Sequence, residues 1–294
     1  MHFTLSSKSI FSLTAIAVLG LPMPAIAGDA SEKPVAQASS ASSWLEPYRH
    51  NHFSDLGAPI IHTFNIEPAF TGRDLFGTYR FHSKNDAIEH ETELELEWGL
   101  TRRLGIIFEL PYIVENERLG PTERGFGDLV VVPRALLVET DHLLLTAQAE
   151  IGLPTGSDDF GQQTTLTPGI AAWYDLGNWW TLQGLIGWEN KVDEDEAALE
   201  FGLGLIKSID LKGHGGADCD HNHRTHAGLL NFHLEFTGEM GLTDDEDGRT
   251  EVNGLVGVSH GLDCGLDIRF GYEFPVTRPA ELDYGWVLGA NWHF

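Results

Sequence analysis

The clearest pattern in the chain is the stretch EHETELELEWGL, which begins at Glu89. Five glutamates take every second position from Glu89 to Glu97, and Leu94, Leu96 and Trp98 stand between or beside them. Residues two apart share one face of a β-strand, whereas a helix would scatter them around its axis. The pattern therefore predicts a strand with one carboxylate face and one apolar face.

The same alternation returns along the chain to its end, for example in CGLDIRFGYEF, which begins at Cys264. Most of these segments are as long as the ~9–11 residues that cross a bilayer at a tilt, and longer than the ~5–6 residues of an ordinary globular strand. The pattern predicts twelve strands, at 73–82, 88–98, 103–113, 126–138, 142–153, 164–174, 178–189, 197–208, 228–240, 250–260, 263–276 and 283–294.

Long strands with a sustained apolar face indicate an all-β fold, a transmembrane antiparallel up-and-down β-barrel of about 12 strands. The alternative is a soluble sandwich, but its dry core would not tolerate the glutamates. In a barrel they face a wet lumen while Leu94, Leu96 and Trp98 face lipid. Pro133 and Pro168 fall inside predicted strands, and we expect them to mark bulges.

The N-terminus has the layout of a secretory signal peptide, with Lys8 before the apolar run Ile10–Leu21 and the small residues AIA ending at Ala27. A membrane anchor is the alternative, although the run is short for one. We predict a signal peptide at 1–27, then a linker and an irregular N-terminal segment at 28–70 near the periplasmic mouth. Residues 71–294 form the predicted outer-membrane barrel.

The final stretch, YGWVLGANWHF, has apolar residues at every second position back from Phe294. Trp292 and Phe294 resemble the terminal signal read by the outer-membrane barrel assembly machinery. This implies a Gram-negative outer membrane, with membrane lipid and that machinery as partners, and a last strand that ends in the periplasm. Alternating back from there puts short turns in the periplasm and longer connections outside, as is usual for such barrels. The long connection 210–228 is the exception.

Three stretches carry a family resemblance: GFGDL (Gly125–Leu129), LPTGS (Leu153–Ser157) and GLTRRLGIIFELPY (Gly99–Tyr112). They resemble pieces of the outer-membrane transport barrel family named for the meta-cleavage (MetA) pathway of phenol degradation, over roughly residues 60–294. The resemblance implies a channel or transporter for a small solute, aromatic or hydrophobic compounds first. It carries over no catalytic residue, and the His-rich connection departs from the family and leaves the solute open.

The formal net charge of −26 excludes a general basic surface for nucleic acid. Carboxylates outnumber arginines on the predicted inner face, and acidic rings favour cations. An internal network without a through-pore is the alternative, because small barrels are often filled by their own side chains. The predicted lumen-lining residues are Arg80, Glu91, Glu93, Glu95, Glu97, Glu109, Arg134, Glu150, His233, Glu235, Asp267, Arg269 and Glu273.

The connection 210–228 gathers imidazoles and carboxylates at the spacing that suits zinc, copper or nickel. A solvated polar loop is the alternative, and no other cofactor is expected, since neither an HExxH motif nor a paired CxxC is present. Cys219 and Cys264 both fall on the predicted periplasmic side and are a candidate disulfide, unless Cys219 is itself a metal ligand. The metal candidates are His214, Asp218, Asp220, His221, His223 and His226.

Catalytic chemistry is not predicted. Ser259 and His260 are adjacent in sequence, but they fall in a predicted periplasmic turn rather than on a membrane-facing strand. The sequence thus predicts a channel that is not an enzyme, with two alternatives: a metal-binding barrel that uses the connection 210–228, and a non-transporting structural barrel.

Overall fold

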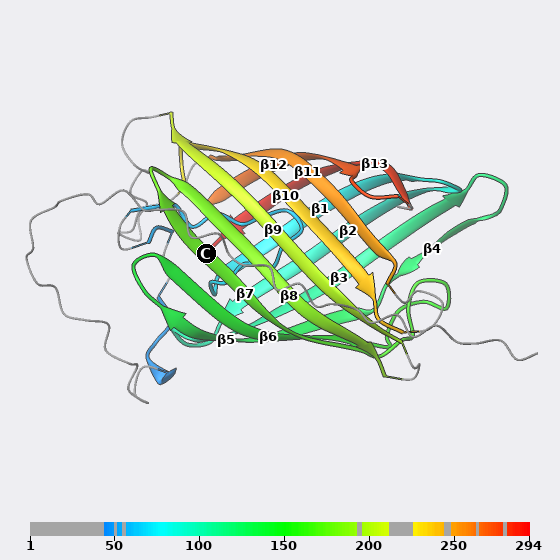
Figure 1. The fold of residues 1–294 in the computed structure, drawn as a ribbon, viewed down its shortest axis with the longest axis horizontal. Coiled ribbons are helices and arrows are strands. Elements are labelled where there is room, and N and C mark those ends of the chain that lie inside the picture. The colour runs from blue at the N-terminus through cyan, green and yellow to red at the C-terminus, as the bar shows by residue number, and fades with distance from the viewer. Residues whose placement is uncertain are drawn as a thin grey trace, which may run out of the picture. The chain divides into compact units, whose positions relative to one another are not determined.

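The computed structural model describes residues 44–49, 52–54, 57–192, 196–211, 226–243, 248–262, 265–278 and 281–294. These residues form a closed antiparallel β-barrel (Figure 1). Its strands are β1 (Arg73–Lys84), β2 (Ala87–Gly99), β3 (Leu104–Glu117), β4 (Thr122–Phe126), β5 (Leu129–Glu139), β6 (Leu143–Leu153), β7 (Thr165–Gly177), β8 (Trp180–Lys191), β9 (Ala197–Asp210), β10 (Leu229–Gly241), β11 (Thr250–Gly261), β12 (Leu266–Pro275) and β13 (Leu282–His293).

The barrel wall has twelve strand positions, although thirteen strands are labelled, because β4 and β5 share one position. Apart from β4 and β5, which do not pair with each other, strands that follow one another in the chain are paired, and β1 pairs with β13 to close the ring. Both β4 and β5 pair with β3, β4 along Tyr112–Asn116 and β5 along Leu104–Glu109. They occupy one position, interrupted at Gly127 and Asp128. The predicted fold class and strand count are confirmed.

Side chains that alternate along the sequence lie alternately on the inner and outer faces of the barrel. In β2, Glu97 is 1% exposed, whereas Leu94 is 54% exposed and lies on the opposite face. Trp292 and Phe294 are also on the outside, where their rings pack together. An apolar outer band rimmed with aromatic rings is what lipid requires of a barrel. Within the described residues, no helix is long and apolar enough to span a membrane.

The prediction that Pro133 and Pro168 mark bulges is wrong. Pro133 pairs with Ile106 and Pro168 pairs with Ala149, and the register is the same on both sides of each proline. A proline lacks the N–H of one ladder bond, so it removes a hydrogen bond without adding a residue. The register shifts lie elsewhere, at Ser83/Lys84, Leu136/Val138 and Asp175/Gly177.

Residues 57–72, here called the luminal segment, run inside the barrel. We call the end where β1 begins and β13 ends the near end, and the opposite end the far end. The segment enters from the near end, bends at residues 64–66 and returns to β1 (Figure 1). The sequence predicted an irregular piece near one mouth, but the structure places it deeper, against the middle of β10.

Candidate functional site

The luminal segment is held at its bend by two charged side chains of the wall. Glu235 of β10 accepts hydrogen bonds from the backbone N–H of Phe64 at 2.9 Å and from that of Asn65 at 3.0 Å. Arg269 of β12 donates to the carbonyl of Thr63 at 2.9 Å. Buried charges of this kind are stable when hydrogen bonds compensate them. The wall therefore positions the bend through its backbone.

Polar contacts continue on the other strands. Gln183 of β8 donates to the carbonyl of Ile61 at 2.6 Å, and Thr146 of β6 donates to the carbonyl of Ala69. The side chain of Asn65 donates to Glu273 of β12 at 2.5 Å. Apart from the bridge between Phe53 and Pro59, the segment lies outside the strand ladders, and side chains of the wall satisfy several of its backbone groups.

Apolar contacts fill the space between the segment and the near half of the wall. Phe64 packs on Leu255 and Val287, and Ile61 packs on Ile206 and Leu229. A third cluster joins the remaining apolar residues of the segment to β5, β6 and β7; it consists of Ala58, Ile60, Ala69, Phe70, Leu136, Leu144, Ala171 and Trp173. These wall residues point inward, so the inner face is not uniformly polar.

Glycines of the wall leave room for two of the segment's side chains. A Cβ at Gly257 would lie 2.7 Å from the Phe64 ring, and one at Gly202 would lie 2.9 Å from Ile66. Contacts this close are forbidden to a real methyl group, so a side chain at either position would displace the segment. The surfaces of the wall and the luminal segment are therefore complementary at these positions.

The far half of the wall has a different chemistry. Arg80 makes ion pairs with Glu91 at 2.7 Å and with Glu93 at 3.3 Å. His82 lies between Glu89 at 3.2 Å and Glu273 at 2.6 Å. Strands β6, β8 and β9 contribute Glu150, Glu189 and Glu200, which lie close enough to repel one another. This half presents mainly carboxylate oxygen.

The predicted lumen-lining residues are all buried or half-buried in the structure. Those that touch the luminal segment include Arg134, which lies 3.7 Å from Glu67, and Glu97, which lies 3.7 Å from His62. His233, Glu235, Arg269 and Glu273 touch it as well. Sequence reasoning missed several buried polar residues that the same alternation turns inward: Asp74, Thr78, Gln183, Asn231, Asn291 and His293.

The prediction that Ser259 and His260 lie in a turn is wrong, because both belong to β11. Ser259 points inward and its Oγ lies 3.0 Å from Nε2 of His233, whose Nδ1 is 3.5 Å from Glu235. This is the order of a nucleophile, a base and an acid. The Phe64 ring covers His233 at 5.0 Å, however, and Glu235 is engaged by the backbone of the segment. The network therefore packs against the luminal segment and holds it through Glu235.

The two short motifs GFGDL and LPTGS meet in the structure. Asp128, in the first, accepts four backbone N–H bonds at 2.7–3.1 Å, from Thr155, Gly156, Gln162 and Gln163. Burial raises the pKa of the Asp128 carboxyl, but the four donors outweigh that and hold the pKa below its usual range. The motifs therefore encode the docking of the β6–β7 connection on the β4–β5 junction.

Most of the predicted metal candidates lie outside the described residues, namely His214, Asp218, Asp220, His221 and His223. Cys219, Cys264 and the predicted signal peptide lie outside them as well. His226 is described, and it lies buried at the near end beside His52 and His293. His52 and His293 were not among the predicted metal candidates.

No family model and no curated protein matches the chain. Among solved structures it is similar to the NanC porin, with a TM-score of 0.51 and 10% identity over 75% of this chain and 99% of that chain. It is also similar to an outer membrane channel from Pseudomonas putida F1, with a TM-score of 0.52 and 16% identity over 80% of this chain and 100% of that chain. At such identities the likeness shows the fold alone, that of an outer-membrane β-barrel.

Proposed function

We propose that the protein is an outer-membrane channel for small solutes in which the luminal segment forms the constriction. The main support for this proposal is the inner surface of the barrel. The luminal segment packs against the wall in the near half, and carboxylates line the far half. A barrel that only served as a scaffold would not need a charged lumen, because apolar packing stabilises at least as well as buried ion pairs.

The near end faces the periplasm in this proposal. Two connections at the near end are short, at Thr140–His142 and Asn178–Trp179, and the far end carries the longer connection 154–164; the connection 210–228, at the near end, is the exception. Short periplasmic turns and longer outer loops are the usual asymmetry of such barrels. A solute from outside thus meets the acidic half first and the segment second.

The charge of the far half makes the channel selective for cations over anions. Glu91, Glu93, Glu150, Glu189 and Glu200 are all in or beside it, and Arg80 compensates only part of that charge. A ring of carboxylates attracts cations and repels anions through the low-dielectric walls. The resemblance to the phenol-pathway family suggests aromatic compounds as the first solutes to test. The acidic far half favours their neutral or cationic forms.

Planar-bilayer recording of the purified, heat-modifiable barrel tests the proposal. We expect steps of cation-selective conductance, and larger steps after deletion of residues 58–70, since the deletion empties the lumen. Deletion of the equally long stretch 30–42 is the matched control and should leave the conductance unchanged. Silent membranes with both the wild type and the 58–70 deletion would identify a non-transporting barrel.

Liposome swelling then identifies the solute class. Cationic, neutral and anionic compounds of similar size should enter in that order of rate, with an aromatic member in each group. Equal rates for anions and cations would contradict the role assigned to the carboxylates.

A further inference from the structure

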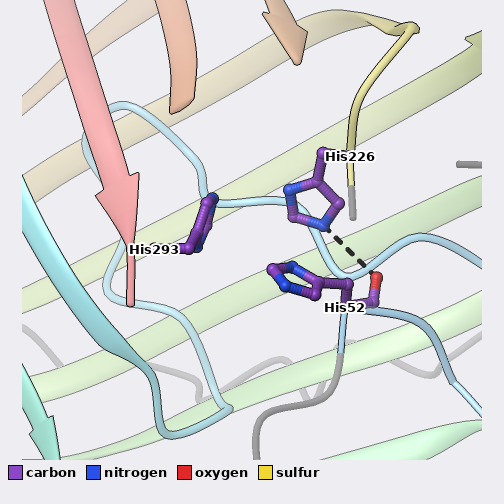
Figure 2. A group of neighbouring side chains, drawn as sticks. All are labelled: His52, His226 and His293. Atoms are coloured by element: carbon purple, nitrogen blue, oxygen red, sulfur yellow. Dashed lines mark hydrogen bonds between the residues drawn. The ribbon is translucent and has the colours of Figure 1, made fainter. Parts of the chain in front are cut away.

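Three buried histidines from distant parts of the chain meet at the near end of the barrel. His52 precedes the luminal segment, His226 precedes β10, and His293 closes β13. Figure 2 shows the three rings around one point. Their centroids are 4.8–5.1 Å apart and their planes stand at 79–87° to one another. One nitrogen from each lies within 4.8 Å of the other two.

Glycines make two of these positions possible. A Cβ at Gly261 would lie 2.0 Å from the carbonyl oxygen of His226, and one at Gly265 would lie 2.7 Å from that of His293. Gly265 has a φ of +91° and accepts the backbone N–H of His293 at 2.7 Å. The backbone at both histidines is thus held by close approaches that only glycine allows.

Two carboxylates orient the rings from outside. Asp267 lies 2.9 Å from Nδ1 of His226 and 3.1 Å from Nε2 of His293. Asp74 lies 2.5 Å from Nδ1 of His293. Histidines that bind metal ordinarily place one ring nitrogen against a carboxylate, which sets the tautomer and the ring orientation. Both ring nitrogens of His293 therefore face carboxylates, and Nε2 of His226 lies 3.3 Å from the carbonyl oxygen of His52 (Figure 2), so a bound ion would replace one of these contacts on each of the two rings.

We propose that His52, His226 and His293 bind one divalent transition-metal ion, zinc first, and that the ion fastens the luminal segment to the barrel wall. Three neutral imidazoles suit zinc, copper or nickel, and a zinc ion holds tetrahedral nitrogens about 3.3 Å apart at Zn–N bonds of about 2.0–2.1 Å. Binding would require side-chain rotations that bring the nitrogens from within 4.8 Å of one another to that separation. Water would supply the fourth ligand.

Charge balance supports a divalent ion. Asp74 and Asp267 bring two negative charges into a region where the three histidines are at most 7% exposed. An ion of charge +2 with neutral imidazoles cancels them, as buried charges require. The competing arrangement has no ion and two protonated imidazoles paired with the carboxylates.

The experiment uses the full-length barrel in detergent, stripped with a chelator and then titrated with Zn²⁺ and with Co²⁺ as a spectroscopic probe. The background variant carries His214, His221 and His223 changed to Ser, so that the other three histidines of the connection 210–228 cannot supply ligands and His226 alone remains. We expect one metal ion per barrel in this background, the visible bands of tetrahedral cobalt, and a rise in the melting temperature on metal addition.

His52→Ala is the decisive variant, because His52 lies outside every strand and its loss leaves the barrel able to fold. In the same background it should lose the bound ion, the cobalt bands and the rise in melting temperature. His142→Ala, at an exposed turn, is the matched control and should bind like its parent. Asp267→Asn should weaken binding about 10–100-fold through loss of ring orientation.

Absence of stoichiometric metal in the background variant, while the wild type binds it, would assign binding to the connection and overturn the proposal. Full binding by the folded His52→Ala variant would overturn it equally. Failure of Zn²⁺, Cu²⁺ and Ni²⁺ to bind the wild type would favour the protonated network.

Discussion

The inner wall of the barrel differs in chemistry between the near and far halves of the lumen. In the near half, the wall meets the luminal segment through apolar clusters and hydrogen bonds that satisfy its backbone. In the far half, the wall presents carboxylates, with Arg80, His82 and Lys84 only partly compensating them. The first arrangement is that of a protein core, and the second is that of a polar channel.

The difference explains which substitutions each half should tolerate. A packed interface loses stability when an atom is added or removed, because neighbours relax only partly. A wall of like charges loses nothing when one charge is neutralised, since the repulsion falls with it. Near-half variants should therefore change stability, and far-half variants should change selectivity.

The largest effect is expected at Phe64, whose ring is 4% exposed against Leu255 and Val287. Phe64→Ala should weaken the docking of the luminal segment by about 3–5 kcal/mol, the usual cost of emptying a packed aromatic site. Hydrogen exchange at the amides of residues 60–70 measures this directly. Phe108→Ala is the control, because Phe108 is on the outer face at 37% exposure and its loss leaves no cavity. Equal exchange in both variants would show that the segment is not packed.

A smaller effect is expected at Gly257, where a Cβ would lie 2.7 Å from the Phe64 ring. Gly257→Ala should cost the docked segment about 1–3 kcal/mol through overpacking. The double variant Gly257→Ala/Phe64→Ala should cost less than the sum of the single variants, because the smaller side chain makes room for the added methyl group. Simple additivity in the same exchange measurement would mean that the two residues do not meet.

The strands could be predicted from the sequence because period-two alternation is local. Glu97 and Leu94 are on opposite faces for the same reason that Trp292 and His293 are, and the strand bounds follow within a few residues. From the sequence, only Trp292 of the pair was singled out, although the same alternation turns His293 inward. The position of Ser259 was misjudged because the turn was predicted to begin at that residue, although the predicted strand 250–260 includes it; β11 continues to Gly261.

The course of the luminal segment could not be predicted. Residues 57–72 have no periodicity, and the bonds that hold them are remote in sequence: Glu235 is 171 residues from Phe64, and Arg269 is 206 residues from Thr63. In the sequence, an inward apolar residue such as Leu255 cannot be told from a lipid-facing one, because its packing partner is in the luminal segment. The three histidines of the near end come from three such distant pieces, so no spacing reveals them.

Neutralising the far half should alter selectivity without loss of stability. The triple variant Glu150→Gln/Glu189→Gln/Glu200→Gln removes three carboxylates that lie close together. We expect the reversal potential in a salt gradient to move toward zero while the free energy of unfolding stays equal or rises, because like-charge repulsion is relieved. Asp141→Asn, at an exposed near-end turn, should leave the reversal potential unchanged. A fall in stability would mean that these glutamates are a structural network.

The smallest effect is expected at Asp128, which belongs to neither half of the lumen and fastens the β6–β7 connection. Asp128→Asn keeps an oxygen that can accept the bonds from Thr155, Gly156 and Gln162 but loses the charge that strengthens them. The cost should be about 1 kcal/mol, the difference between charged and neutral acceptors. Conductance and ion selectivity should not change.

The pH dependence of this contribution has a definite sign. The pKa of Asp128 is lowered in the fold, because its four backbone donors outweigh burial. The stabilisation is therefore fully present above the ordinary aspartate pKa of about 3.9 and disappears as the pH falls through the lower folded value. Wild type and Asp128→Asn should differ in their denaturation midpoints at pH 7 and converge as the pH drops below that range. Asp141→Asn should match the wild type at every pH, and a constant gap between wild type and Asp128→Asn down to the lowest pH would show that the charge plays no part in docking the connection.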